Sequence, residues 1–395
     1  MNVDMTRSLS ALDAQLAEAD VDGYLIRASG TDASQRYLAE FTAPDPFTTL
    51  YTAEGDLQLL VSSLEYARAR REAAGEVSRP SEYDAGSLRE QYGSREGRAR
   101  ALKAWLADNG VASVSVPASF PVGLADELRD LAVSVAPDSG ATLEKVRAIK
   151  TETEIDSIRA AQAANEHAMA VAAELFETCT IDSDGGLLLD DAALTSERVQ
   201  QRIEIALLER GHALDETIVA CGAQAADPHE RGHGQLTAGA PIIVDIFPRS
   251  KSTGYYADMT RTFVVGEPSE SITEWHALTQ RALGAALETI EAGVTGAAVH
   301  AAACEIYEEA GLPTLRADSD TETGFIHSTG HGIGLDIHEH PRLAPGSGEL
   351  EAGMVVTVEP GLYDPAVGGV RIEDLVVVRE DGVENLTEYP QTLTL

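Results

Sequence analysis

Apolar and polar residues alternate in short blocks over the first third of the chain. Apolar positions recur with helical spacing over residues 9–19 and 98–107. Short apolar runs with strand character occur at residues 24–26, 56–61 and 111–116. Helical and strand-like segments that alternate along a chain predict an α/β domain. The sequence Pro137-Asp138-Ser139-Gly140 then marks a break.

After Lys150 the segments are longer. Helical spacing predicts helices at residues 153–176, 195–210, 274–291 and 296–310, with Thr195 or Ser196 as the N-cap of the second. Strand-like runs occur at residues 241–247, 255–265, 355–359 and 370–378, and residues 182–191 are expected to form a polar loop. Segregated helices and strands predict an α+β domain. We therefore predict an α/β domain at 1–140, a linker at 141–152 and an α+β domain at 153–395.

Composition narrows the class of protein. Apolar residues make up 44% of the 395 residues, which excludes a largely disordered chain. The formal net charge of −36 argues against nucleic acid as a partner, because phosphates require a basic patch. There is no apolar run of about 18 residues to enter a membrane, and residues 1–7 lack the apolar core of a secretory signal. Three scattered cysteines predict no disulfide framework, so we expect a cytoplasmic protein.

The acidic excess has a second interpretation. Lysine is nearly absent, since only Lys103, Lys145, Lys150 and Lys251 occur, while aspartate, glutamate, alanine and arginine are abundant. This pattern resembles proteins of halophiles that accumulate salt, in which molar salt screens the repulsion between surface carboxylates. We therefore predict a halophilic protein. The alternative is an ordinary acidic cytosolic enzyme.

Two aspartates stand out within apolar strands. Asp245 interrupts the run Ile242-Ile243-Val244-Asp245-Ile246, where an unpartnered carboxylate would be costly to bury. Asp258 follows, and on a strand it shares one face with Thr260 and Thr262. Two aspartates on neighbouring strands can share a cation. The alternative for each is a turn or an ion pair.

Four histidines occur within residues 327–340, in a chain that has ten. Glycines at 330, 332 and 334 lie among them and allow the backbone to approach a ligand closely. A single histidine of this kind would be read as structural. The group predicts a metal or catalytic site.

Two further carboxylates follow apolar strand residues. Glu359 ends the run Val355-Val356-Thr357-Val358 and is followed by Pro-Gly. Glu373 lies two residues after Arg371, on the same face of a predicted strand, and these two could simply pair with each other. Two Asp, two Glu and a His without sulfur ligands suit Mn²⁺, with Co²⁺ and Zn²⁺ as alternatives. Four carboxylates exceed the need of one ion, so we predict two divalent metal ions that activate a water.

The motifs follow a characteristic order: Asp245, Asp-x-Thr-Arg-Thr at 258–262, His-Ser-x-Gly-His-Gly-x-Gly-Leu-x-x-His-Glu at 327–339, Thr-x-Glu-Pro-Gly at 357–361 and Arg-x-Glu-Asp at 371–374. This order resembles the pita-bread metallopeptidases, most closely the branch of prolidase and Xaa-Pro aminopeptidase. Residues 35–38 and 143–150 resemble the creatinase-type N-terminal domain and its linker. Methionine aminopeptidases lack that N-terminal domain, and creatinases lack the metal ligands.

The resemblance implies a role for each matching residue. It implies that Asp245 binds one metal ion through both oxygens and that Asp258 and Glu373 bridge the two ions. It further implies that His331 and Glu359 complete the second metal site. Glu359 would also carry the proton of the attacking water.

The resemblance also implies residues that contact the substrate. The counterparts of His229, His327 and His338 would hold the scissile carbonyl oxygen and assist the leaving nitrogen. Arg371 would anchor the substrate carboxylate or steady the bridging glutamate. Arg342, in a His-Glu-x-Pro-Arg run, would meet the free carboxylate of a dipeptide, for which a guanidinium is a bidentate partner. His340 is expected beside the site.

The implied activity is metal-dependent hydrolysis of the bond before proline in a small peptide, by a cytoplasmic homodimer. The alternatives are a hydrolase of the same fold that acts on another small C–N substrate, and a binding module that has lost catalysis. Dipeptides and longer peptides are not distinguished by the sequence. One departure concerns specificity: the family usually has Asp-x-Gly at the first aspartate, whereas this chain continues Asp245-Ile246-Phe247-Pro248-Arg249, with a longer hairpin to Asp258.

Overall fold

The computed structural model describes residues 9–395 and divides the chain into two units, at Arg147 and Ala148. The predicted linker at 141–152 therefore contains the boundary, and it also contains helix α7 (Thr142–Ala148). Residues 1–7, which were expected to lack the apolar core of a secretory signal, lie outside the described range. Among residues 9–395, no helix is both long and apolar enough to cross a membrane.

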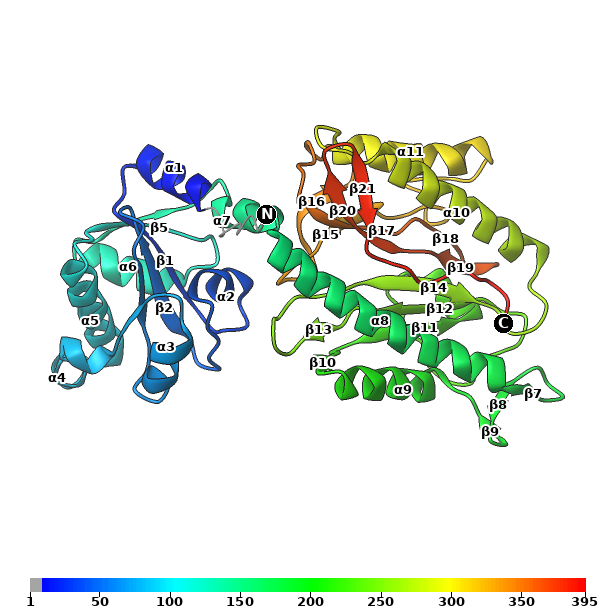
Figure 1. Ribbon diagram of the computed structural model, residues 1–395, viewed down its shortest axis with the longest axis horizontal. Helices are drawn as coiled ribbons and strands as arrows, with labels where there is room; N and C mark the ends of the chain where they lie inside the picture. Colours follow the sequence, from blue (N-terminus) through cyan, green and yellow to red (C-terminus); the bar gives the residue numbers. More distant parts are fainter. Residues whose placement is uncertain (1–8) are drawn as a thin grey trace, which may run out of the picture. The chain divides into compact units, whose positions relative to one another are not determined.

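The N-terminal unit is a six-stranded mixed sheet flanked by helices (Figure 1). The sheet order is β4-β3-β2-β1-β5-β6. Its strands are β1 (Gly23–Ala28), β2 (Phe47–Thr52), β3 (Leu57–Leu60), β4 (Glu76–Ser78), β5 (Ser113–Val116) and β6 (Ser134–Pro137). Its helices are α1 (Ser10–Ala19), α2 (Ala33–Ala39), α3 (Tyr66–Glu72), α4 (Ala85–Tyr92), α5 (Ser94–Asp108) and α6 (Val122–Asp130), with a 3₁₀ turn, η1 (Pro80–Tyr83). The predicted α/β class is confirmed.

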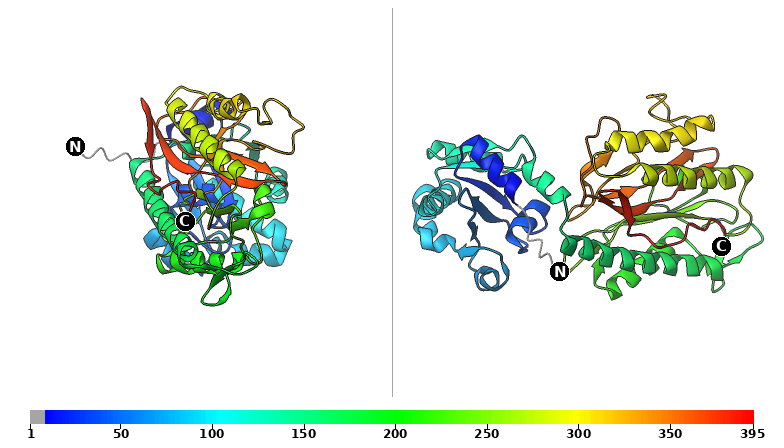
Figure 2. Two further views of the ribbon diagram at one scale, coloured as in Figure 1. Left: turned by 90° about the vertical axis from the view of Figure 1, so that its right-hand side faces the viewer. Right: turned by 45° about the horizontal axis from the view of Figure 1, so that its top comes forward.

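The C-terminal unit places strands between two pairs of helices (Figures 1 and 2). The helices are α8 (Glu152–Thr178), α9 (Ser196–Glu209), α10 (Glu270–Thr289) and α11 (Gly296–Glu309). One core joins α8 and α9 to the strands at residues 217–221, 242–246 and 259–263, and a second core joins α10 and α11 to the strands at residues 339–343, 355–358, 361–364, 368–371 and 374–379. The α+β prediction is confirmed. Thr195 is the N-cap of α9, because its side chain accepts a hydrogen bond from the backbone of Arg198.

Two sheets of this unit carry the site. The first consists of β11 (Thr217–Cys221), β12 (Ile242–Ile246) and β14 (Met259–Phe263). The second has the order β16-β15-β17-β20-β21, with β15 (Gly330–Gly332), β16 (Glu339–Leu343), β17 (Val355–Val358), β20 (Asp374–Arg379) and β21 (Gly382–Asn385). The hairpin β18 (Gly361–Asp364) and β19 (Gly368–Arg371) is a separate two-stranded sheet, and β10 (His212–Ala213) pairs with β13 (Arg249–Ser250). A 3₁₀ turn, η2 (Gly222–Ala226), follows β11.

Two sequence predictions were wrong in detail. The single strand predicted at 370–378 is divided, since β19 ends at Arg371, β20 begins at Asp374, and the two belong to different sheets. The loop predicted at 182–191 contains a strand, β8 (Leu187–Leu189), which is the middle strand of a small sheet whose outer strands, β7 (Thr180–Ile181) and β9 (Ala192–Ala193), flank the predicted loop. In both segments the apolar pattern is compatible with several short strands, and pairing partners decide where each one ends.

Candidate metal centre

A cavity of about 820 Å³ opens in the C-terminal unit. Every site residue predicted from the sequence lines it: His229, Asp245, Asp258, His327, His331, His338, Arg342, Glu359, Arg371 and Glu373. These residues come from segments up to 144 residues apart in the chain (from His229 to Glu373). His340 is exposed and does not line the cavity.

Strand pairing brings the carboxylates together. Asp245 lies in the middle sheet strand β12, opposite Ile218 of β11 and Thr260 of β14. Asp258 immediately precedes β14. Glu373 lies in the break between β19 and β20, where its backbone N–H donates to the carbonyl of Thr260. The division of the predicted strand at 370–378 therefore places Glu373 against β14.

Glu359 and His331 reach the same point from the second sheet. Glu359 follows β17, and its backbone N–H donates to the carbonyl of Thr329, which precedes β15. His331 lies in β15, and its Nδ1 is 3.1 Å from the carbonyl oxygen of Gly332. Because a carbonyl only accepts, Nδ1 carries the proton, and Nε2 presents its lone pair to the carboxylates.

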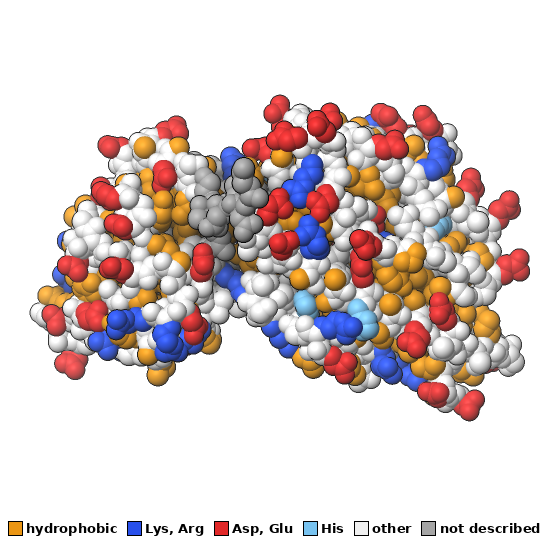
Figure 3. Space-filling view, viewed as in Figure 1, with side chains coloured by type: hydrophobic (Ala, Val, Ile, Leu, Met, Phe, Trp, Pro, Cys, Tyr) orange, Lys and Arg blue, Asp and Glu red, His pale blue; other side chains and the backbone are white. Residues whose placement is uncertain are grey.

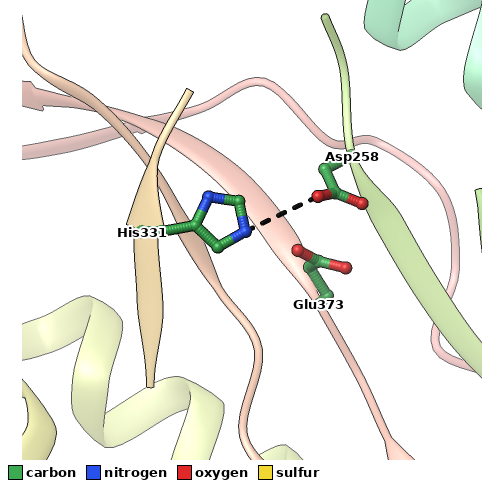
Figure 4. A group of neighbouring side chains, drawn as sticks. All are labelled: Asp258, His331 and Glu373. Atoms are coloured by element: carbon green, nitrogen blue, oxygen red, sulfur yellow. Dashed lines mark ion pairs between the residues drawn. The ribbon is translucent and has the colours of Figure 1, made fainter. Parts of the chain in front are cut away.

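Three of the predicted ligands form a tight group. Single donor atoms of Asp258, His331 and Glu373 all lie within 4.8 Å of one another (Figure 4). His331 Nε2 is 3.7 Å from Asp258 Oδ2 and 3.5 Å from Glu359 Oε1, so Glu359 adjoins the group. All three side chains of the group are buried.

Charge repulsion is strong at this site. Burial and the neighbouring carboxylates, Glu373 first among them, raise the pKa of Asp258 well above its usual range. Burial and the carboxylates of Glu359 and Asp245 do the same to the pKa of Glu373. Burial raises the pKa of Glu359 to about 7. Burial, with His338 nearby, lowers the pKa of His331 to about 3, which keeps its imidazole neutral.

The residues fit divalent cations. Asp245 Oδ1 and Glu373 Oε1 are buried, and within residues 9–395 neither has a hydrogen-bond partner. A buried carboxylate oxygen without a partner is costly, and a cation is the partner that also offsets the repulsion between the acids. Carboxylate oxygens with one neutral imidazole are ligands for hard to borderline divalent ions.

Arg371 orients two of the carboxylates through hydrogen bonds. Its Nη2 donates to Asp245 Oδ2 at 2.6 Å, and its Nε donates to Thr260 Oγ1 at 3.1 Å. Thr260 in turn donates to Glu373 Oε2 at 2.8 Å. The pairing of Arg371 with Glu373 considered from the sequence is therefore indirect, because the arginine forms its ion pair with Asp245.

Tyr363 also belongs to the site, although it was not predicted from the sequence. Its buried hydroxyl accepts from Arg371 Nη1 at 2.9 Å and lies 3.0 Å from His327 Nε2. His327 Nδ1 lies 2.7 Å from the carbonyl of Ser328, so this imidazole is held through both nitrogens. Burial, with Arg371 nearby, lowers the pKa of His327 to about 3. In the sequence, Tyr363 is an ordinary aromatic residue after Glu-Pro-Gly, and no local pattern singles it out.

The remaining predicted residues lie at the open part of the cavity. His229, His338 and Arg342 are exposed. The ring of His338 stands edge-on to that of His331, with centroids 4.3 Å apart. Arg342 is opposite His331 in the ladder between β15 and β16. These side chains can meet a ligand that enters from solvent.

Comparison with known families also indicates a site for divalent metal ions. The model of metallopeptidase family M24 matches residues 156–380, which is more than half of the chain. The chain belongs to metallopeptidase family M24. The model of the creatinase/prolidase N-terminal domain matches residues 9–159. Membership of M24 makes the protein an enzyme and implies divalent metal ions at the cluster described above.

Several M24 relatives are similar over much of the chain. The probable dipeptidase PepE of Mycobacterium tuberculosis is 37% identical over 71% of this chain and 68% of its own. The Xaa-Pro dipeptidase of Pyrococcus furiosus is 33% identical over 64% of this chain and 66% of its own. Among solved structures, an Xaa-Pro dipeptidase from Bacillus anthracis has a TM-score of 0.80 at 28% identity, covering 98% of this chain and 99% of that one. The prolidase from Pyrococcus horikoshii has a TM-score of 0.79 at 26% identity, covering 98% and 99%.

Proposed function

We propose that this protein is a dipeptidase that hydrolyses the bond before proline, with two divalent metal ions, Mn²⁺ first among the candidates. The observation that carries the proposal is the convergence of four carboxylates and one neutral histidine in a cavity that also presents Arg342. The similarity to Xaa-Pro dipeptidases supports the choice of substrate.

The ligand roles in this proposal are those that the resemblance to the family implies. Asp245 is assigned to one ion, Asp258 and Glu373 to both, and His331 with Glu359 to the other. Bound there, the ions supply Lewis acidity and a water of lowered pKa. Arg371 fixes the orientation of Asp245 directly and that of Glu373 through Thr260, so the carboxylates need little rearrangement when they bind metal.

Glu359 is assigned the proton transfer. We assign to its carboxylate, which lies 3.5 Å from His331 Nε2 within the group of proposed ligands, the acceptance of the proton of the attacking water and its release to the leaving nitrogen. The hydroxyl of Thr357 lies 3.4 Å from Glu359 Oε1 and orients the carboxyl group.

The substrate is assigned an orientation by charge. Arg342 binds the free carboxylate of a dipeptide, for which its guanidinium is a bidentate partner. His229 and His338, exposed at the same cavity, contact the scissile carbonyl oxygen and the leaving nitrogen. The bond before proline lacks an N–H, so a site that grips the carbonyl oxygen and the carboxylate does not depend on the missing donor.

The test compares Gly-Pro and Leu-Pro with Leu-Pro-Ala, after chelation and after addition of Mn²⁺, Co²⁺ or Zn²⁺. We expect proline release from the dipeptides only and only with added metal. Turnover of Leu-Pro-Ala would indicate an Xaa-Pro aminopeptidase, and no turnover of either with metal bound would indicate another C–N substrate. Arg342→Met should raise KM for dipeptides about tenfold or more, and Arg342→Lys should restore part of it.

Three other proposals concern the protein as a whole. We propose a homodimer, which sedimentation analysis would test, and a cytoplasmic location. We also propose adaptation to high salt. Acidic side chains are scattered over the face shown in Figure 3, which suits a surface that is stable when salt screens its charges.

A further inference from the structure

This chain has Phe247 where the family pattern Asp-x-Gly has its glycine, and the pairing of the strands fixes the position of Phe247 in the sheet. Ile246 is opposite Met259 in the β12–β14 ladder, and the backbone N–H of Ala257 donates to the carbonyl of Pro248. The register therefore continues past the end of β12 and places Phe247 opposite Asp258. On the other side the β11–β12 ladder ends at the pair of Thr217 and Ile246, and the residues next to that pair, Glu216 and Phe247, both line the cavity.

Phe247 shares its face of the sheet with the metal ligand Asp245. Side chains two residues apart on an extended segment point to the same side. The cavity is consistent with a shared face, because it is lined by residues of this face of the sheet: Glu216, Ile218, Asp245, Phe247 and Asp258. The half-buried ring of Phe247 is thus an apolar wall between two carboxylates, directly beside the metal centre.

The position of the metal centre limits what can touch this wall. The proposed function requires the scissile carbonyl to lie beside the cations that the carboxylates would hold. The α-carbon of the N-terminal residue is then one bond from the carbonyl carbon. The carboxylate end of the dipeptide is drawn to Arg342, which lies on β16 of the other sheet. The N-terminal residue is left on the wall formed by β11 and β12, where Phe247 and Ile218 are apolar and Glu216 can attract the ammonium group.

We propose that Phe247 is a specificity-determining residue that favours an apolar side chain at the N-terminal position of the substrate. This inference rests on the proposed function for the orientation of the dipeptide. The cavity, at about 820 Å³, is far larger than a dipeptide, so the ring acts by contact and not by excluding large side chains. Glu216 forms an ion pair with Arg231, and a substrate ammonium replaces or joins that arginine.

The experiment measures kcat/KM for Leu-Pro and Gly-Pro in wild type, Phe247→Ala and Phe247→Leu. We expect wild type to prefer Leu-Pro, and the Leu-Pro to Gly-Pro ratio to fall about tenfold in F247A, mainly through KM for Leu-Pro. F247L retains an apolar side chain and should keep the ratio within about threefold. Bound Mn²⁺ is measured in each variant by elemental analysis, because Phe247 faces Asp258, and only variants with the wild-type stoichiometry are compared.

Two further readouts separate this inference from the proposed function. Leu-Ala and Gly-Ala are assayed in parallel. Turnover of these two dipeptides alone would refute proline specificity, and the ratio of their kcat/KM values would still test the role of Phe247. If neither series is cleaved, calorimetry on the Mn²⁺-loaded protein compares binding of Leu-Pro and Gly-Pro with and without F247A. A ratio that F247A leaves unchanged, or a wild type that prefers the glycine substrates, overturns the role of Phe247.

Discussion

Replacing Arg371 by methionine tests the central electrostatic argument. The Arg371 side chain is buried, and its ion pair with Asp245 has a 2.6 Å contact between Nη2 and Oδ2. It also donates to Tyr363 and Thr260. Methionine has a similar volume without the charge, so Arg371→Met removes the cation and leaves the surrounding packing largely filled.

The expected cost is large because Asp245 stays behind. Removing one partner of a buried ion pair leaves an uncompensated charge and costs about 3–5 kcal/mol. Since domains are stable by only about 5–15 kcal/mol, this is a substantial fraction of the total. The loss should be greatest after chelation and smaller with Mn²⁺ present, because a cation bound near Asp245 replaces part of the missing positive charge.

The assay is urea unfolding followed by tryptophan fluorescence. The chain has two tryptophans, Trp105 in the N-terminal unit and Trp275 on α10 of the C-terminal unit. A Trp105→Phe background therefore makes Trp275 report on the unit that contains the site. This separation matters because two units need not unfold in a single transition.

The control is the Asp245→Asn, Arg371→Met double variant. Asparagine removes the charge that methionine leaves unpaired, so the double variant should recover at least about 2 kcal/mol relative to Arg371→Met. A loss below about 1 kcal/mol in Arg371→Met, or strictly additive effects of the two substitutions, would refute the argument that Arg371 offsets the buried carboxylates.

Three other outcomes are expected. Asp258→Asn should abolish turnover and lower the bound metal measured by elemental analysis; near-native turnover would contradict its assignment as a bridging ligand. Burial, with Arg261 nearby, lowers the pKa of His276 to about 4, so below pH 6.5 protons bind the unfolded state preferentially and stability declines as pH falls towards 4. His276→Gln should flatten that decline, by at most about 1.4 kcal/mol per pH unit in urea unfolding, and an unchanged slope would count against it. Activity should rise with KCl towards the molar range; a flat or falling profile would overturn the halophile prediction.

Local apolar spacing was sufficient to predict the four long helices of the C-terminal unit. The apolar spacing at 153–176 and 296–310 predicted α8 and α11 almost to their ends, because an amphipathic helix needs a continuous stripe of apolar positions. The strand at 370–378 was different. Its apolar pattern continues through Ile372, yet β19 and β20 pair with different partners, and only the partners fix where each strand stops.

The proposed ligands could be named from the sequence, since Asp245, Asp258, His331, Glu359 and Glu373 each stand out in an apolar or glycine-rich context. The interactions that hold these side chains in place could not be predicted from the sequence. Tyr363, the route from Arg371 through Thr260 to Glu373, and the position of Phe247 opposite Asp258 depend on segments distant in the chain. A sequence records which side chains are available to a site, whereas hydrogen bonds and ion pairs act over a few ångströms and exist only after the sheets have brought those side chains together.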